Sequence, residues 1–166
     1  RVQPGENEEL PCERAEARRM QGEAITGMRS SLCLLGALLG RCGYVTMEHP
    51  GGCIIGERPI DLHIRALQQM GVEFREEEGL LSAQVKDGKM HGAEITLEFP
   101  SVGATENILL AAVKADGDTR ILGAAREPEV TALCEFLTAC GAQIEGIGET
   151  ELLVHGDRPL HGTQFT

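Results

Sequence analysis

The chain has 166 residues, and 15 Lys and Arg against 26 Asp and Glu give it a net charge of −11 at pH 7. This length suits one domain of ordinary size, and 42% hydrophobic residues allow a core without a disulfide or metal. So acidic a surface repels phosphate backbones and anionic lipids, which disfavours general nucleic-acid or membrane-surface binding. We therefore expect a small ligand.

The N-terminal region carries no predicted membrane or secretion segment. Residues 1–13 contain two prolines among glutamates and indicate a loosely held lead-in. The longest apolar run, 32–39, is too short to span a bilayer. The chain opens on Arg1 without a basic and apolar leader, so we expect an excised piece with no signal peptide.

The six cysteines show no C-x-x-C pair, and no two histidines have metal-ligand spacing, so the sequence gives little support for zinc. Three disulfides remain an alternative for an extracellular chain. Four of the six lie on apolar helical stretches, which favours reduced thiols in a cytoplasm. The six cysteines are Cys12, Cys33, Cys42, Cys53, Cys134 and Cys140.

The first half of the chain alternates helical and strand patterns. A helix is predicted over 14–39, apolar nearly all round from Met28 and ended by Gly40 and Gly43. A strand over 44–46 and a loop beginning at His49 follow. A short helix over 60–70 ends at Gly71.

Strands are then predicted over 72–75, 80–85 and 93–98, with turns at 78–79 and 87–88. The second half shows a helix from Pro100 to about 114 and a strand at 121–122. A further helical stripe runs from Val130 to Leu137, with Gly141 as its stop signal. Strands over 142–147 and 151–155 complete the pattern.

This order repeats. Gly43 matches Gly117, and Gly71 matches Gly141 at an offset of 70. We expect two units, about 28–98 and 99–166, each of helix, strand, helix and further strands. One such unit covers only one side of its sheet, so several must pack together to close a core. The first unit has extra loop residues around Cys53, and this difference suggests that function lies there.

The loop over 50–63 is the first candidate site. Three glycines and two prolines let it approach a ligand closely, and Cys53 lies five residues before Arg58. A nearby guanidinium lowers the pKa of a thiol, and it also suits phosphate or carboxylate. The alternative is that Cys53 is an apolar filler and Arg58 a solvated charge.

The segment beginning at Ser101 is the second candidate. Unpaired amides at a helix start, with Gly103 permitting close approach, suit an anion. An ordinary Ser or Thr cap is the alternative. Asp61 is equally ambiguous because it stands where a helix cap is expected. Arg29, near the start of a buried helix, needs a partner, which a bound phosphate would supply.

Four strings together resemble one family. They are Met28–Ser31, 50–63 (PGGCIIGERPIDLH), 99–107 (FPSVGATEN) and 125–130 (AREPEV). In this order they are similar to UDP-N-acetylglucosamine 1-carboxyvinyltransferases, the enolpyruvyl transferases of peptidoglycan synthesis. The resemblance runs from about Met28 to His155, and residues 1–27 match only loosely.

The resemblance implies transfer of the enolpyruvyl group of phosphoenolpyruvate to the 3-hydroxyl of UDP-N-acetylglucosamine by addition and elimination, with no metal or organic cofactor. Cys53 falls on the family's proton-donating loop cysteine, which fosfomycin alkylates, and Arg58 on an arginine that contacts both substrates' phosphates. Arg29 falls on a further anion-binding arginine. The uracil-holding segment corresponds to Pro59, Ile60, Asp61 and Leu62, and the diphosphate-binding helix start to Ser101, Val102 and Gly103.

The resemblance also implies an α/β (α+β) fold, an inside-out barrel domain of repeated units whose helices are enclosed by mixed sheets. The substrates would bind between this domain and a second one, so this piece alone is expected to be inactive. Phe99 and Pro100 depart from relatives that have a lysine before the Ser-Val-Gly string, which leaves diphosphate binding open. The alternatives are a non-catalytic nucleotide-sugar binding module and the related 3-phosphoshikimate enolpyruvyl transferase, which lacks the loop thiol.

Overall fold

Two four-stranded sheets form the outer layers of the computed structural model, which describes residues 19–20, 32–48 and 60–165. The first has the order β1-β2-β4-β3 and the second the order β5-β6-β8-β7. In both, the first two strands are parallel and the others pair antiparallel. The strands are β1 (Arg19–Met20), β2 (Tyr44–Glu48), β3 (Val72–Glu77), β4 (Leu80–Val85), β5 (Glu94–Thr96), β6 (Asp118–Leu122), β7 (Gln143–Glu145) and β8 (Glu151–His155).

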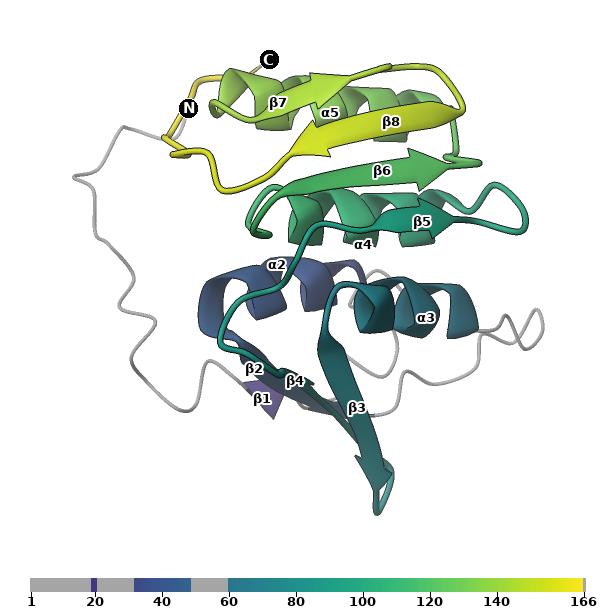
Figure 1. The fold of residues 1–166 in the computed structure, drawn as a ribbon, viewed down its shortest axis with the longest axis vertical. Coiled ribbons are helices and arrows are strands. Elements are labelled where there is room, and N and C mark those ends of the chain that lie inside the picture. The colour runs from purple at the N-terminus through teal and green to yellow at the C-terminus, as the bar shows by residue number, and fades with distance from the viewer. Residues whose placement is uncertain (1–18, 21–31, 49–59, 166) are drawn as a thin grey trace, which may run out of the picture.

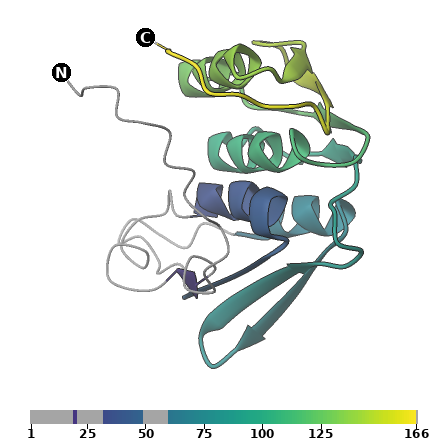
Figure 2. The ribbon, with the colours of Figure 1, turned by 90° about the vertical axis from the view of Figure 1, so that its left-hand side faces the viewer.

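In the part of the chain that the structure describes, four helices pack on the inner faces of these sheets: α2 (Cys33–Cys42), α3 (Asp61–Gln69), α4 (Val102–Ala112) and α5 (Pro128–Ala139). Helix α4 is central and contacts the other three (Figures 1 and 2). Its Ile108 and Leu109 are fully buried. The predicted fold class, with helices enclosed by mixed sheets in repeated units, is confirmed, although the two sheets do not close into a barrel.

Helices α2 and α4 run in the same direction. Cys33 of α2 contacts Gly103 of α4, and an added Cβ on Gly40 would meet Lys114, beyond the end of α4. Between these points, a Cβ on Gly36 would lie 2.7 Å from Oδ1 of Asn107. Because contacts advance along both helices together, the N-termini of α2 and α4 lie at the same end of the molecule.

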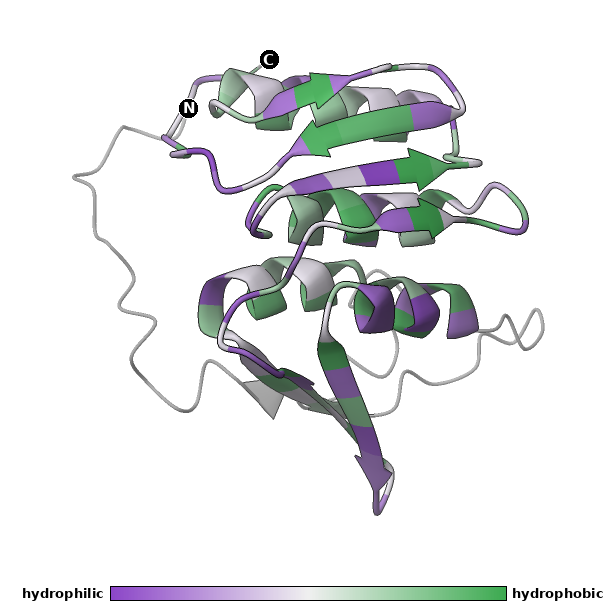
Figure 3. Cartoon of the chain, viewed as in Figure 1, coloured by the Kyte–Doolittle hydropathy of each residue, from purple (hydrophilic) through white to green (hydrophobic). Residues whose placement is uncertain are grey.

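Hydrophobic and hydrophilic residues are distributed along the elements in keeping with this layered arrangement (Figure 3). The inner side chains of β2 and β4, such as Val45 and Ala83, are buried, and the β3–β4 hairpin becomes hydrophilic toward its tip. At that tip Glu78 and Gly79 both have positive φ, 50° and 77°, as the predicted two-residue turn requires. In the described ranges, no helix is long and apolar enough to cross a bilayer.

The glycines predicted to end helices do so in three places. Gly43, Gly71 and Gly141 have φ of 70°, 88° and 103°, the left-handed conformation of a helix stop. The helix predicted over 14–39 is wrong in two respects. Arg19–Met20 forms strand β1 and pairs with β2, and α2 begins at Cys33 and continues through Gly40 to Cys42.

Several strand ends also differ from the prediction. β6 begins at Asp118, three residues before the predicted 121, because pairing with β8 extends it. β5 is confined to Glu94–Thr96 within the predicted 93–98. β3 continues to Glu77, since antiparallel pairing with β4 extends to the turn. The pairing partners, which are remote in sequence, set these boundaries.

His155 joins three strands on the outer face of the second sheet. Its Nδ1 lies 3.0 Å from Asp118 of β6 and its Nε2 lies 3.1 Å from Glu145 of β7. Hydrogen bonds to these two carboxylates raise the pKa of His155, with Glu145 the larger contributor. Protonated His155 therefore donates to both neighbouring strands.

We expect the stability of the chain to depend on pH through His155. Because the folded-state pKa is raised, the contribution is complete below the unfolded pKa of about 6.5 and is lost as pH rises through the folded pKa. Urea unfolding across this window should show a larger fall in the free energy of unfolding for the wild type than for His155→Gln. Parallel pH profiles for the two proteins would contradict this role.

Candidate functional site

The first turns of three helices meet at one end of the described structure. Cys33, the first residue of α2, has its Sγ 3.8 Å from the carbonyl oxygen of Gly103 in α4. His63, in the first turn of α3, lies against Gly103 as well, since a Cβ there would be 3.4 Å from its Cε1. The predicted segments 60–62 and 101–103 are therefore brought to the same end of the fold.

The start of α4 has the geometry of a capped helix N-terminus. Ser101 is extended, with φ −128° and ψ 114°, and its Oγ accepts a hydrogen bond from the Ala104 amide at 3.4 Å. The amides of Val102 and Gly103 have no acceptor within the helix, because the carbonyl four residues before each of them lies outside it. Ser101 is thus a cap, and the two amides beside it are donors of the kind that binds anionic oxygens.

The start of α3 corrects one expectation. Ile60, half-buried, is the residue before the helix, and it contributes no side-chain cap. Asp61 is instead the first helical residue and is exposed, so it does not cap α3. Leu62 is only 8% exposed and belongs to the core. Of the predicted uracil-holding segment, Ile60 and Asp61 therefore present the surface.

A buried polar cluster lies directly behind these helix starts. Asn107 is fully buried, accepts a hydrogen bond from the Gly36 amide at 2.6 Å and contacts Nδ1 of His63 at 3.1 Å. His63 is 7% exposed. The cluster joins α2, α3 and α4 by hydrogen bonds at the end where the candidate residues gather.

The four cysteines in the described residues are thiols rather than disulfides. Cys33 lies 3.5 Å from Glu106, and burial together with this carboxylate raises its pKa to about 11. Burial, with a smaller contribution from Glu135, raises the pKa of Cys134 to about 11 as well. Both thiols are therefore poor nucleophiles at neutral pH.

A hollow of about 400 Å³ borders the α4 start. The adjoining loop is fixed there by Thr105, whose Oγ1 donates to the Ser101 carbonyl at 2.8 Å and accepts from the Ala125 amide at 3.1 Å. The exposed Arg126, in the predicted AREPEV string, is therefore held next to the first turn of α4. The hollow is lined by Pro100, Ala124, Arg126, Glu127 and Thr150.

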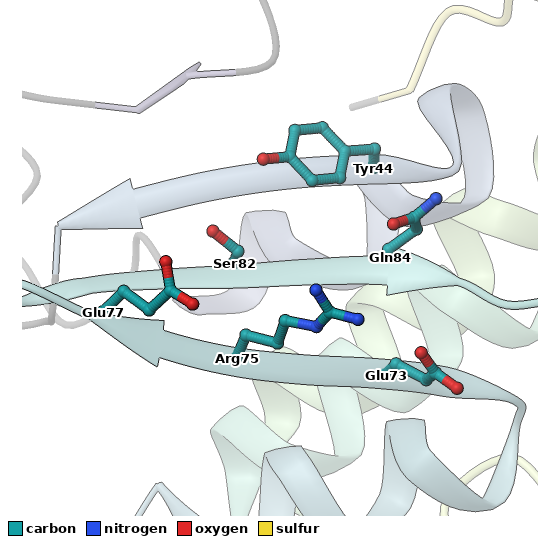
Figure 4. A pocket seen from close by; sticks show the side chains of 6 residues that line it. All are labelled: Tyr44, Glu73, Arg75, Glu77, Ser82 and Gln84. Carbon is teal, nitrogen blue, oxygen red and sulfur yellow. The ribbon is translucent and has the colours of Figure 1, made fainter.

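A second hollow, of about 270 Å³, lies on the outer face of the first sheet (Figure 4). Its Arg75 is flanked along β3 by Glu73 and Glu77. Two carboxylates against one guanidinium make this face unfavourable for a phosphate. It shares no residue with the predicted site and is lined by Tyr44, Glu73, Arg75, Glu77, Ser82 and Gln84.

Four predicted residues, Arg29, Cys53, Arg58 and Pro59, lie outside the described residues. Within residues 19–20, 32–48 and 60–165, no group of three or more His, Cys, Asp or Glu could hold a metal ion.

Sequence reasoning missed Asn107 and left His63 without a role. Asn107 interrupts the apolar run of α4, and a polar residue in a helix buried on every side needs a partner. That signal was available in the sequence. The partner could not be identified, because His63 and Gly36 are 44 and 71 residues away.

Comparison with known families gives one match over nearly the whole chain. Residues 3–166 fit the family model described as EPSP synthase (3-phosphoshikimate 1-carboxyvinyltransferase). Two curated relatives, from Chlorobium limicola and Granulibacter bethesdensis, are both named UDP-N-acetylglucosamine 1-carboxyvinyltransferase. Each is 49% identical over 144 residues, 87% of this chain and 34% of the relative. The chain thus spans about a third of their length.

Solved structures support the fold. The enolpyruvyl transferase NikO from Streptomyces tendae matches 87% of this chain and 34% of its own, with a TM-score of 0.72 and 22% identity. An EPSP synthase from Acinetobacter baumannii matches 81% of this chain and 30% of its own, with a TM-score of 0.60 and 23% identity. At these identities the likeness concerns the fold alone.

Proposed function

The chain belongs to the EPSP synthase family of enolpyruvyl transferases, and from this premise we propose that it is part of a UDP-N-acetylglucosamine 1-carboxyvinyltransferase of peptidoglycan synthesis. The observation that carries the proposal is the 49% identity to relatives of that name. The convergence of the helix starts of α2, α3 and α4, with the amides of Val102 and Gly103 at that end, supports it.

In this proposal the helix starts hold the nucleotide sugar. Ser101, Val102 and Gly103 receive the diphosphate, for which amide donors and the positive end of the helix dipole are suited. The segment 59–62 holds the uracil ring, where Ile60 and Asp61 are at the surface. Arg58 and Arg29 contribute guanidinium groups, which match phosphate oxygens with paired donors.

The proposed reaction is addition followed by elimination. The Cys53 thiol gives its proton to the methylene carbon of phosphoenolpyruvate, and the sugar 3-hydroxyl oxygen bonds to the adjacent carbon while its proton passes to a base outside this chain. A methyl proton then returns to the Cys53 thiolate while the carbon–oxygen bond to phosphate breaks, and the departing phosphate takes up the proton that the base removed from the sugar hydroxyl. The products are enolpyruvyl-UDP-N-acetylglucosamine and inorganic phosphate, so atoms and charge balance.

The share of its relatives that the chain spans and the state of its cysteines lead to two further proposals. Because the chain spans about a third of its relatives, we propose that it binds the nucleotide sugar but does not turn over without the remaining protein. We also propose that the protein acts in the cytoplasm. The four described cysteines support this because they are not in disulfides.

The test is the alkylation rate of each cysteine, mapped by mass spectrometry with iodoacetamide and with fosfomycin at pH 8. With pKa values of about 11, Cys33 and Cys134 should react roughly a hundredfold more slowly than an ordinary exposed thiol. Cys53 should react fastest, and UDP-N-acetylglucosamine should change its rate. This result would support both the loop thiol and the nucleotide-sugar site.

Shikimate 3-phosphate provides the matched ligand control. It should leave the Cys53 rate unchanged if the nucleotide-sugar enzyme is the right member of the family, whereas a response to it alone would favour the 3-phosphoshikimate enzyme after which the family model is named. A Cys53 rate equal to that of Cys33, with no response to either ligand, would contradict the proposal. Binding without turnover after the missing part is restored would favour a non-catalytic module.

A further inference from the structure

The hollow of about 270 Å³ on the outer face of the first sheet is lined by polar side chains from three adjacent strands (Figure 4). The strand register places Ser82 of β4 opposite Arg75 of β3, and Gln84 of β4 between Tyr44 of β2 and Glu73 of β3. Because side chains alternate between the two faces of a strand, these residues project from the same side of the sheet. The hollow is therefore a feature of the sheet itself and not of a loop.

The three charged side chains of β3 at this hollow are not equivalent. Glu73 has Lys86 as its ion-pair partner, with Nζ 3.6 Å from the carboxylate. Among the described residues, Arg75 and Glu77 have no ion-pair partner, and they do not pair with each other. Figure 4 shows the guanidinium of Arg75 pointing away from Glu77, toward Gln84. One positive and one negative group therefore remain at the hollow without a countercharge.

The spacing of these two groups limits the ligands that can engage both. Arg75 and Glu77 are two residues apart on one strand, which places their Cα atoms roughly 6–7 Å apart. An extended dipeptide has a similar length, about 7 Å for two residues. With a hydrogen bond of about 2.8 Å at each end, it also reaches a guanidinium that is turned away from the carboxylate.

The size of the hollow agrees with this estimate. Sites for drug-sized ligands measure about 300–1,000 Å³, and this hollow is slightly smaller. Its two unpaired charges have opposite signs, so an anion or a cation alone would leave one of them without a countercharge. A short ligand that carries both an ammonium and a carboxylate satisfies both.

We propose that this hollow is a ligand site, separate from the candidate site, that binds a small zwitterion of dipeptide length. Arg75 donates to the terminal carboxylate of the ligand, and Glu77 accepts from its terminal ammonium. Further hydrogen bonds come from Ser82, opposite Arg75, and from the Gln84 amide, which has no side-chain partner among the described residues. Because the hollow shares no residue with the helix starts, this inference does not rest on the proposed function.

The test is a titration of the full chain with alanyl-alanine, followed through the backbone amide shifts in ¹H–¹⁵N NMR. Two blocked ligands separate the ends: N-acetyl-alanyl-alanine lacks the ammonium, and alanyl-alanine amide lacks the carboxylate. Arg75→Gln and Glu77→Gln remove the corresponding protein groups one at a time. Arg65→Gln is the matched control, because Arg65 is an exposed arginine on α3 that pairs with Glu98 at 3.1 Å.

Alanyl-alanine should bind with a Kd of about 1 mM and shift the amides of Ser82 and Gln84. Each blocked ligand should bind the wild type about fivefold more weakly, as expected for the loss of one exposed charge pair. Arg75→Gln should no longer distinguish the dipeptide from its amide, and Glu77→Gln should no longer distinguish it from the acetylated form. Arg65→Gln should behave like the wild type. A general loss of structure would not match each variant to one end of the ligand.

The inference is overturned if alanyl-alanine at about 10 mM leaves these amides unchanged, or if both variants discriminate among the three ligands as the wild type does. An equal response to inorganic phosphate would also overturn it, because the site would then recognise only an anion. Shifts that appear on raising the protein concentration without ligand would show that a second copy of the chain occupies the hollow, which contradicts the proposal as well. The comparison of the three ligands on the wild type decides even if a variant fails to fold.

Discussion

Gly36→Ala is expected to lower the free energy of unfolding by about 3 kcal/mol. The added Cβ would overlap the backbone carbonyl oxygen of Asn107 and lie 2.7 Å from its Oδ1, so α2 and α4 must separate. Such overpacking costs about 1–3 kcal/mol, and losing the buried hydrogen bond between these residues adds a similar amount. The better helix propensity of alanine returns only about 1 kcal/mol.

Urea unfolding of the two proteins measures this difference, and Gly162→Ala is the matched control. Gly162 is exposed in the C-terminal segment, and no atom lies within 4 Å of its hypothetical Cβ. The control should leave stability within about 1 kcal/mol of the wild type. If Gly36→Ala behaves like Gly162→Ala, the close approach of α2 and α4 at this point is wrong.

The accuracy of the sequence prediction depended on how local each signal was. Gly71 and Gly141 were correctly predicted as helix stops, because a left-handed residue after an apolar stripe is decided within a few positions. Gly40 was wrongly predicted as a helix stop, because its role depends on a residue that is remote in sequence. It does not stop α2, and its small size serves a contact with Lys114, which lies 74 positions away.

Strand β1 shows the same limit more strongly. Arg19 and Met20 lie in a charged stretch that has a helical pattern, yet they pair in parallel with Thr46 and Met47. Two residues hold no periodicity of their own, so only the partner strand defines them. Tertiary pairing therefore overrode the local pattern.

For the candidate site, the sequence motifs identified individual residues but did not predict how these residues are arranged in space. The motifs placed Ser101 and Gly103 at a helix start, and the structure places them beside the first turn of α3. What the motifs could not show is how the three helix starts are held together. That depends on Asn107, whose contacts to Gly36 and His63 link helices far apart in sequence.

Two buried threonines differ in their hydrogen bonding, so replacing each with valine should change the free energy of unfolding in opposite directions. Thr105 and Thr119 are both fully buried. The hydroxyl of Thr105 accepts from the Ala125 amide at 3.1 Å and donates to the Ser101 carbonyl at 2.8 Å. The hydroxyl of Thr119 has no partner within the described part of the chain.

Thr105→Val should therefore lower the free energy of unfolding by about 1–3 kcal/mol, because valine leaves the Ala125 amide buried without its acceptor. Thr119→Val should raise it by about 1 kcal/mol, since it removes an unsatisfied hydroxyl from a strand where valine is favoured. Urea unfolding of both variants checks the signs. Equal destabilisation by both would show that shape, rather than hydrogen bonding, governs these positions, and the Thr105 link between the α4 start and the Arg126 loop would then have no energetic role.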